Sequence, residues 1–218
     1  MSNIKIETTE DGSDTLYVES MDEHYHSTKG ALTETNYIFI EMGLLARAKK
    51  DVNVLEIGFG TGLNAIQTLH AARKQDLSVS FTTLELYPLQ FEQVKNLSYA
   101  KLDLFEDLHQ AKWNTPTIIT SYFELNKLHL DFTTLPNLKL GKQFDVIYFD
   151  AFAPEKQPNM WSQQLFDHLY VLINDGGILT TYCAKGVIRR MLQEAGFMVE
   201  RLPGPPNGKR EIIRATKL

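Results

Sequence analysis

The chain has 218 residues, 43% of them hydrophobic, which fits one globular domain, and its net charge of −5 argues against a surface that binds nucleic acid throughout. No apolar run approaches the roughly 18 residues of a membrane-spanning helix, and the polar residues 1–12 lack the apolar segment of a signal peptide. The single cysteine, Cys183, excludes an internal disulfide, so we expect a cytoplasmic protein without a membrane partner.

Residues 1–50 predict an N-terminal extension with short strands, such as 15–18, followed by a helix over 33–48 that Thr33 caps. From residue 51 onward, strands and helices alternate. The expected strands are 52–57, 79–84, 118–123, 127–130, 144–149, 177–182, 197–201 and 210–215, and the expected helices are 63–73, 88–100, 102–111, 162–173 and 186–195. This alternation predicts a mostly parallel α/β sheet covered by helices on both faces, with an antiparallel edge at the C-terminus.

A glycine-rich turn follows the first strand of the core. Glu56 stands at the end of that strand, and Gly58, Gly60 and Gly62 allow the backbone to bend sharply and to approach a ligand closely. The next helix presents free N–H groups, which favour a carboxylate such as that of S-adenosylmethionine, while Glu56 is placed for its amine. A dinucleotide-binding fingerprint needs a glycine where Leu63 stands, and no phosphate-loop lysine follows.

Three later strands also lead into acidic residues. An acid at the place of Glu85 accepts bonds from ribose hydroxyls in doubly wound sheets, and Asp131 is placed to accept a bond from an adenine amino group. Asp150 follows the strand predicted over 144–149, where a carboxylate beside a sulfonium methyl can hold an amine and accept its proton. The residues alone leave open a surface role for Glu85 and a turn-forming role for the two aspartates.

The remaining candidates concern the acceptor. Phe152 is placed to stack on a base, Pro154 stiffens its loop, and Met160 and Trp161 either pack or line a base pocket. Residues 185–218 hold eight Lys and Arg against three acids, and this basic end either faces phosphates or is a solvated surface. Its candidate phosphate contacts are Lys185, Arg189, Arg190, Lys209 and Arg210. The six histidines and the cysteine show no metal-ligand spacing, so we expect no metal, with His24 and His26 at the surface.

Several short strings of this sequence occur together in one known family. The strings are Tyr25-His26-Ser27, Gly30, Glu34-Thr35, Gly58-Phe59-Gly60-Thr61-Gly62-Leu63-Asn64, Glu85, Pro88-Leu89, Asp131, the run 150–161, Gly186-Val187-Ile188-Arg189-Arg190, Ala195-Gly196-Phe197 and Gly208-Lys209-Arg210-Glu211. Across residues 22–215 they resemble the methyltransferase domain of the bifunctional tRNA 5-methylaminomethyl-2-thiouridine biosynthesis (MnmC) family.

That resemblance implies a class I, Rossmann-like methyltransferase fold, a three-layer sandwich with a seven-stranded sheet. It also implies methyl transfer from S-adenosylmethionine to the amine of 5-aminomethyl-2-thiouridine at the tRNA wobble position. Asp150 would face this amine as the catalytic residue. The cofactor residues would be Glu56, Gly58, Phe59, Gly60, Gly62, Asn64, Glu85 and Asp131, and Lys156 would join the substrate contacts given above.

The bifunctional members continue into an FAD-dependent oxidoreductase domain. This chain ends at Leu218 without a second glycine fingerprint, so we expect a single methyltransferase domain over 1–218, with 51–218 as its catalytic core. A separate enzyme would then supply the aminomethyl substrate. Three alternatives stay open: a methyltransferase of small-molecule amines, a non-catalytic module that binds S-adenosylmethionine or tRNA, and a polyamine aminopropyltransferase, although the Asp150 loop lacks a second aspartate.

Overall fold

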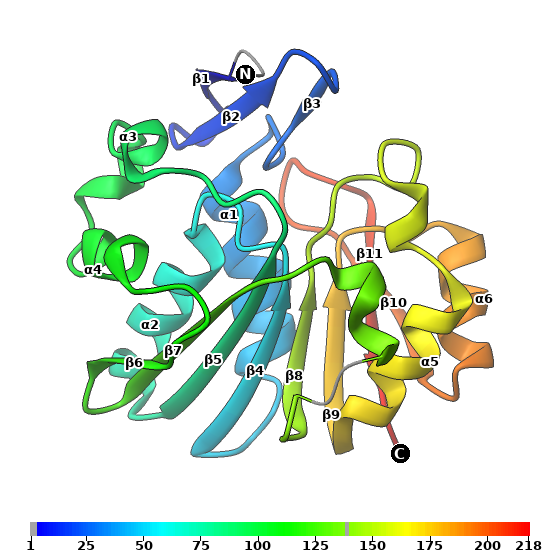
Figure 1. Ribbon diagram of the computed structural model, residues 1–218. Helices are drawn as coiled ribbons and strands as arrows, with labels where there is room; N and C mark the ends of the chain where they lie inside the picture. Colours follow the sequence, from blue (N-terminus) through cyan, green and yellow to red (C-terminus); the bar gives the residue numbers. More distant parts are fainter. Residues whose placement is uncertain (1–3, 138–139) are drawn as a thin grey trace.

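A computed structural model describes residues 4–137 and 140–218 (Figure 1). Its strands are β1 (Ile4–Thr8), β2 (Asp14–Val18), β3 (Glu23–His24), β4 (Asp51–Ile57), β5 (Ser78–Glu85), β6 (Thr117–Thr120), β7 (Phe123–His129), β8 (Phe144–Phe149), β9 (Ile173–Thr181), β10 (Met198–Pro203) and β11 (Glu211–Thr216). Its helices are α1 (Ala31–Thr35), the π-helix η1 (Asn36–Leu44), α2 (Leu63–Gln75), α3 (Phe91–Val94), η2 (Ser98–Lys101), α4 (Phe105–Gln110), η3 (Phe132–Asn137), η4 (Pro158–Met160), α5 (Gln163–Leu172) and α6 (Gly186–Glu194).

The central sheet has the strand order β10-β11-β9-β8-β4-β5-β7-β6. Strands β4, β5, β7, β8 and β9 run parallel, whereas β11 joins β9 antiparallel, as the sequence predicts for the C-terminal edge. The described sheet has eight strands instead of seven, because the chain reverses after β6, which pairs antiparallel with β7. Since β4 lies between β5 and β8, the order reverses at its carboxyl end, where open α/β sheets bind ligands.

Both faces of this sheet are covered, which explains why all six residues of β8 are buried and why Asp145 is its only charged residue. Neighbouring residues of a strand point to opposite faces. Tyr148 accordingly packs with Phe39 in the core beneath η1 and α2, whereas Phe149 packs with Phe166 and Trp161 in the core beneath α5. Cys183 is buried in this second core. No helix within residues 4–137 and 140–218 has the length and apolarity to span a membrane.

The helix predicted over 33–48 exists, but the predictions of where it starts and of which residue caps it are wrong. Helix α1 begins at Ala31, and η1 continues it as far as Leu44. Thr33 lies inside the helix and does not cap it; its N–H donates to Asp11 Oδ2 at 2.9 Å, and Leu32 N–H donates to Ser13 Oγ at 3.1 Å. Side chains of the N-terminal sheet therefore satisfy the free N–H groups that every helix start leaves.

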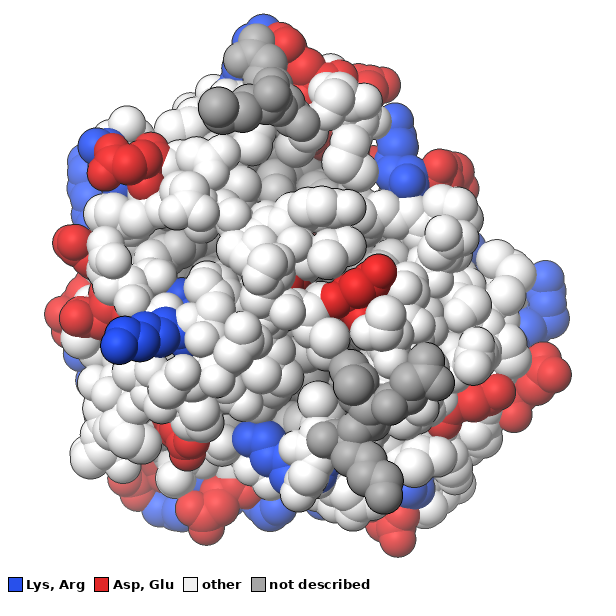
Figure 2. Space-filling view, in the orientation of Figure 1, with Lys and Arg blue, Asp and Glu red and all other residues white. Residues whose placement is uncertain are grey.

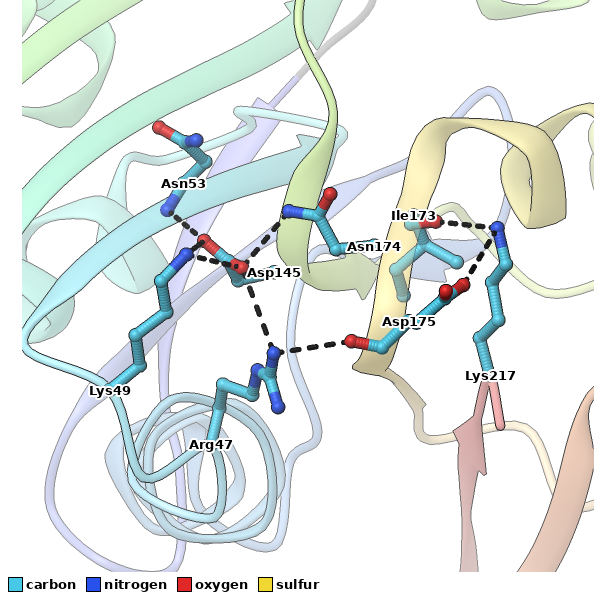
Figure 3. Close-up of polar contacts among 8 residues, drawn as sticks. All are labelled: Arg47, Lys49, Asn53, Asp145, Ile173, Asn174, Asp175 and Lys217. Carbon is cyan, nitrogen blue, oxygen red and sulfur yellow. Dashed lines mark hydrogen bonds and ion pairs between the residues drawn. The ribbon is translucent and has the colours of Figure 1, made fainter.

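That N-terminal sheet, in the order β1-β2-β3, stands over the carboxyl ends of the central strands (Figure 1). At the opposite end of the central sheet, Asp145 is fully buried, and Figure 3 shows its polar contacts. Its carboxylate accepts bonds from Lys49 Nζ at 2.8 and 2.9 Å, Asn53 N at 3.0 Å and Asn174 Nδ2 at 3.0 Å. These contacts join β8 to β4, to β9 and to the segment after η1, so this end of the sheet is structural.

Candidate active site

A cavity of about 1050 Å³ lies between the carboxyl ends of the central strands and the N-terminal sheet. Its walls come from the β4–α2 turn, the segments after β5, β7 and β8, the N-terminal residues around Tyr25, and Lys209 between β10 and β11. The volume is at the upper end of the range for pockets that bury whole cofactors. No group of three or more His, Cys, Asp or Glu among the described residues is arranged to hold a metal ion.

The glycine turn forms one wall of this cavity. Gly58 has a φ of +96°, and a Cβ there would lie 3.0 Å from the backbone oxygen of Asp150, so only glycine allows the turn to pack against the β8 loop. Gly60, at a φ of +51°, donates its N–H to Glu85 Oε2 at 3.1 Å. Glu85 also accepts a bond from Tyr87 N at 2.9 Å, and it lines the cavity while holding the turn in place.

Six of the eight predicted cofactor residues line the cavity: Gly58, Phe59, Gly60, Asn64, Glu85 and Asp131. Asp131 also makes the predicted turn, since its Oδ1 accepts bonds from Thr133 N at 2.9 Å and Thr133 Oγ1 at 2.7 Å. Gly62 lies behind the wall, against His109.

Glu56 is fully buried, and it is not among the residues that line the cavity. Burial raises the pKa of Glu56 well above its usual value, and the charges of Asp150 and Glu85 act in the same direction. Burial thus favours the neutral form of Glu56, whose side chain lies beneath the wall of the cavity.

Asp150 lies where the cofactor turn and the β8 loop meet. Asn64, in the first turn of α2, donates its side-chain N–H to Asp150 Oδ2 at 2.8 Å. Burial raises the pKa of Asp150 to about 7, and the charge of Glu34 adds to this rise, whereas Asn64 and Lys209 oppose it. A carboxyl group with a pKa near 7 exchanges a proton readily at neutral pH, as a general base requires.

The loop after Asp150 is fixed by two aromatic side chains. Trp161 Nε1 donates to Phe152 O at 2.9 Å, and Tyr182 OH donates to Ala151 O at 2.8 Å. Phe152 lies on the cavity wall, with its ring edge-on to Tyr25 at 5.0 Å between centroids. Of the other predicted substrate residues of this loop, Met160 lines the cavity, whereas Pro154, Lys156 and the buried Trp161 do not.

Of the predicted basic contacts, only Lys209 reaches the cavity. Lys185 is paired with Glu155, and Lys156 donates to Met21 O at 2.8 Å. Arg190 and Arg210 are exposed and Arg189 is half-buried, all outside the cavity wall. Figure 2 shows the face of the molecule that is turned to the viewer in Figure 1. The charged side chains on this face lie mostly around its outline, and the Lys and Arg residues form no continuous basic surface there.

Sequence reasoning missed a group of cavity residues that come from the N-terminal segment. His26, expected at the surface, lines the cavity, and its Nε2 lies 2.8 Å from Thr61 Oγ1, which also accepts a bond from Tyr99 OH at 2.9 Å. Burial lowers the pKa of His26 to about 4, so its ring is neutral at pH 7. Tyr25 and Glu34 also line the site, and the only signal for them was their place in the family strings.

Comparison with known proteins identifies the family. Residues 90–218 match the model of the S-adenosyl-L-methionine-dependent methyltransferases. The chain belongs to this family. Its predicted cofactor, S-adenosylmethionine, and its predicted class as a methyltransferase are thereby confirmed.

Curated relatives of this methyltransferase are longer proteins. It is 33% identical over 205 residues to the tRNA 5-methylaminomethyl-2-thiouridine biosynthesis bifunctional protein MnmC of Cupriavidus necator, covering 86% of this chain and 31% of that protein. It is also 33% identical over 203 residues to the MnmC of Aeromonas salmonicida, covering 83% and 30%. The chain thus spans about a third of the length of these relatives.

Solved structures show the same fold. MnmC2 from Aquifex aeolicus superposes with a TM-score of 0.83 at 24% identity, over 99% of this methyltransferase and 70% of that chain. Spermidine synthase from Thermotoga maritima superposes with a TM-score of 0.65 at 16% identity, over 100% and 70%. Both comparisons confirm the class I fold that the sequence predicts.

The cavity of this methyltransferase fits S-adenosylmethionine in its chemistry. The glycine turn offers a close backbone approach and a helix N-terminus for a carboxylate, and the Oδ1 of Asn64 is a buried acceptor without a hydrogen-bond partner, suited to the amine of the cofactor. Glu85 and Asp131 offer carboxylate oxygens for ribose and adenine.

Proposed function

We propose that this chain transfers a methyl group from S-adenosylmethionine to the exocyclic amine of 5-aminomethyl-2-thiouridine at the wobble position of a tRNA, giving 5-methylaminomethyl-2-thiouridine. The observation that carries this proposal is the bond from Asn64 to Asp150, because it joins the cofactor helix to a carboxyl group suited to an amine. The names of the curated relatives supply the identity of the acceptor.

Asp150 would prepare the acceptor amine. An aminomethyl group is largely protonated near pH 7 and has no free lone pair in that form. With a pKa of about 7, Asp150 in its ionised state accepts one proton from the ammonium nitrogen, which leaves a neutral amine and a neutral Asp150. S-adenosylmethionine would supply a methyl group bound to a positively charged sulfur. The sulfur would keep the electron pair of the carbon–sulfur bond that breaks. Asn64 fixes the direction of the Asp150 carboxylate, so the nitrogen is positioned as well as deprotonated.

Recognition of the tRNA would rest on a base placed in the cavity. Single-stranded anticodon bases are read by stacking and by contacts to their edges. Tyr25 and Phe152 offer ring faces in the wall, and Tyr87 lines the cavity with 73% of its surface exposed. Contacts to tRNA phosphates would come from basic residues outside the cavity wall, namely Lys185, Arg189, Arg190 and Arg210. The proposal also includes a cytoplasmic location for the protein. A separate enzyme would make the aminomethyl group of the substrate.

Radiolabelled S-adenosylmethionine and three acceptors test this function. We expect transfer to tRNA that carries 5-aminomethyl-2-thiouridine, and none to the same tRNA with an unmodified wobble uridine or to putrescine. Efficient transfer to putrescine without tRNA would instead make the chain a methyltransferase of small amines. Binding of S-adenosylmethionine without transfer to any acceptor would make it a non-catalytic module.

A further inference from the structure

Glu34 places a second carboxyl group in the wall of the cavity that Asp150 also lines. It belongs to α1, lines the cavity and is only 7% exposed. Its Oε1 accepts the N–H of Ser27 at 3.2 Å, whereas its Oε2 is buried without a hydrogen bond. A buried carboxylate oxygen without a hydrogen bond is costly to the protein, which points to a ligand that satisfies it.

Glu34 Oε2 has no hydrogen bond, but it forms an ion pair with the ammonium group of Lys209. Lys209 Nζ lies 3.4 Å from Glu34 Oε2 and 4.5 Å from the ring centroid of Tyr182. A carboxylate and an aromatic face together form a site for a cation. The 3.4 Å separation is longer than the about 2.8 Å of a charge-assisted hydrogen bond, so Lys209 does not saturate the carboxylate.

Glu34 and Asp150 also interact through their charges. The negative charge of Glu34 raises the pKa of Asp150, and the positive charge of Lys209 lowers it. A cation that enters between the two carboxylates is therefore attracted by both. The two acids have different hydrogen-bond partners. Asn64 orients Asp150 toward the cofactor turn, whereas Ser27 anchors Glu34 to the N-terminal segment.

Building on the proposed function, we propose that Glu34 binds the acceptor amine in its protonated form and delivers it to Asp150. Glu34 contributes affinity and selectivity for a cationic acceptor, while Asp150 takes the proton. An acceptor whose group is neutral, such as a hydroxymethyl uridine, forfeits this contact and binds weakly.

The variant Glu34→Gln tests this role, because the amide keeps an oxygen for the Ser27 N–H and removes only the charge. We expect its KM for tRNA carrying 5-aminomethyl-2-thiouridine to rise at least tenfold, with a smaller change in kcat and an unchanged Kd for S-adenosylmethionine. Glu34→Asp keeps the charge and should recover part of the affinity. The matched control is Glu41→Gln, an exposed glutamate on η1, which should behave like wild type. A KM for Glu34→Gln within twofold of wild type would overturn the proposal.

A second readout is independent of the tRNA. The Asp150 carboxyl can be titrated by NMR in the full chain without an acceptor, and Glu34→Gln should lower its pKa from about 7, whereas Glu41→Gln should not. An unchanged Asp150 titration would show that Glu34 does not act on this site. If wild type failed to methylate the tRNA while the Asp150 pKa still responded to Glu34, the acceptor would be wrong but the paired-carboxylate site would stand.

Discussion

Asp145 and Asp150 lie at opposite ends of β8, about 16 Å apart along the strand, and their surroundings shift their pKa values in opposite directions. Burial alone would raise the pKa of Asp145, but bonds from Asn53 N, Lys49 and Asn174 outweigh it and lower the pKa. Asp150 has one such donor, Asn64, and its pKa rises to about 7. One strand thus carries a structural carboxylate at its start and a chemically active one just beyond its end.

Replacing the active carboxylate should separate catalysis from cofactor binding. Asp150→Asn keeps an oxygen for the Asn64 N–H but cannot accept a proton, so turnover on the aminomethyl tRNA should fall by about 10² to 10⁴-fold. Calorimetry should give an unchanged Kd for S-adenosylmethionine. Asp167→Asn, at an exposed position of α5, serves as the control. Turnover within threefold of wild type would rule out Asp150 as the proton acceptor.

The pH profile of kcat/KM should report the raised pKa of Asp150. Only the ionised carboxylate accepts a proton, so kcat/KM should increase from pH 5 and approach its plateau above the pKa of about 7. An aspartate with an ordinary pKa of about 3.9 would give no increase over this range. Initial rates measured between pH 5 and 8 provide the test. A flat profile of kcat/KM would contradict the role of Asp150 as the proton acceptor.

The structural carboxylate should matter for stability alone. Asp145→Asn removes the buried charge that accepts bonds from Lys49, Asn53 and Asn174, so the free energy of unfolding should fall by about 1.5–3 kcal/mol. Because the pKa of Asp145 is lowered in the folded state, its stabilisation is present above the unfolded pKa of about 3.9 and is lost as the pH falls below it. Urea titrations at pH 7 and pH 3 measure both effects, and the variant should lose less on acidification than wild type. A weakened Kd for S-adenosylmethionine would show that the two ends of the sheet are coupled.

Thr61 should link the stability of the glycine turn to cofactor binding. Thr61→Val removes the hydroxyl that contacts both His26 and Tyr99, and leaves the buried Tyr99 hydroxyl and the half-buried His26 ring without this partner. We expect a loss of about 1–3 kcal/mol in the free energy of unfolding and a weaker Kd for S-adenosylmethionine. Urea unfolding and calorimetry provide the test, and Thr115→Val, at an exposed position outside the cavity wall, is the comparison. An unchanged Kd would mean that the turn keeps its shape without this network.

Local sequence patterns predicted the core elements well where burial dictates the pattern. Strand β8 matches its prediction at both ends, because its aromatic and β-branched residues stand between Gln143 and Asp150, with Asp145 as the one charged residue inside the strand. The expected helix over 88–100 is instead two short pieces, α3 and η2. Its apolar residues pack around α4 as separate turns, and no local signal distinguishes that arrangement from one helix.

Site residues were predictable where they sit at strand ends and not where a distant segment supplies them. The end of β8 fixes the place of Asp150, and the end of β5 fixes that of Glu85. Glu34 and His26 reach the cavity only because the N-terminal sheet folds over the carboxyl edge (Figure 1). Glu56 is buried because β4 is covered on both faces, and its contact with the cofactor stays a prediction.

The most direct test is nucleoside mass spectrometry of tRNA carrying 5-aminomethyl-2-thiouridine after incubation with S-adenosylmethionine and either wild type or Asp150→Asn. We predict that wild type converts this nucleoside to 5-methylaminomethyl-2-thiouridine and that the variant, at equal cofactor occupancy, leaves it almost unchanged. Equal conversion by both proteins, or no conversion by a wild-type protein that binds the cofactor, would contradict the account.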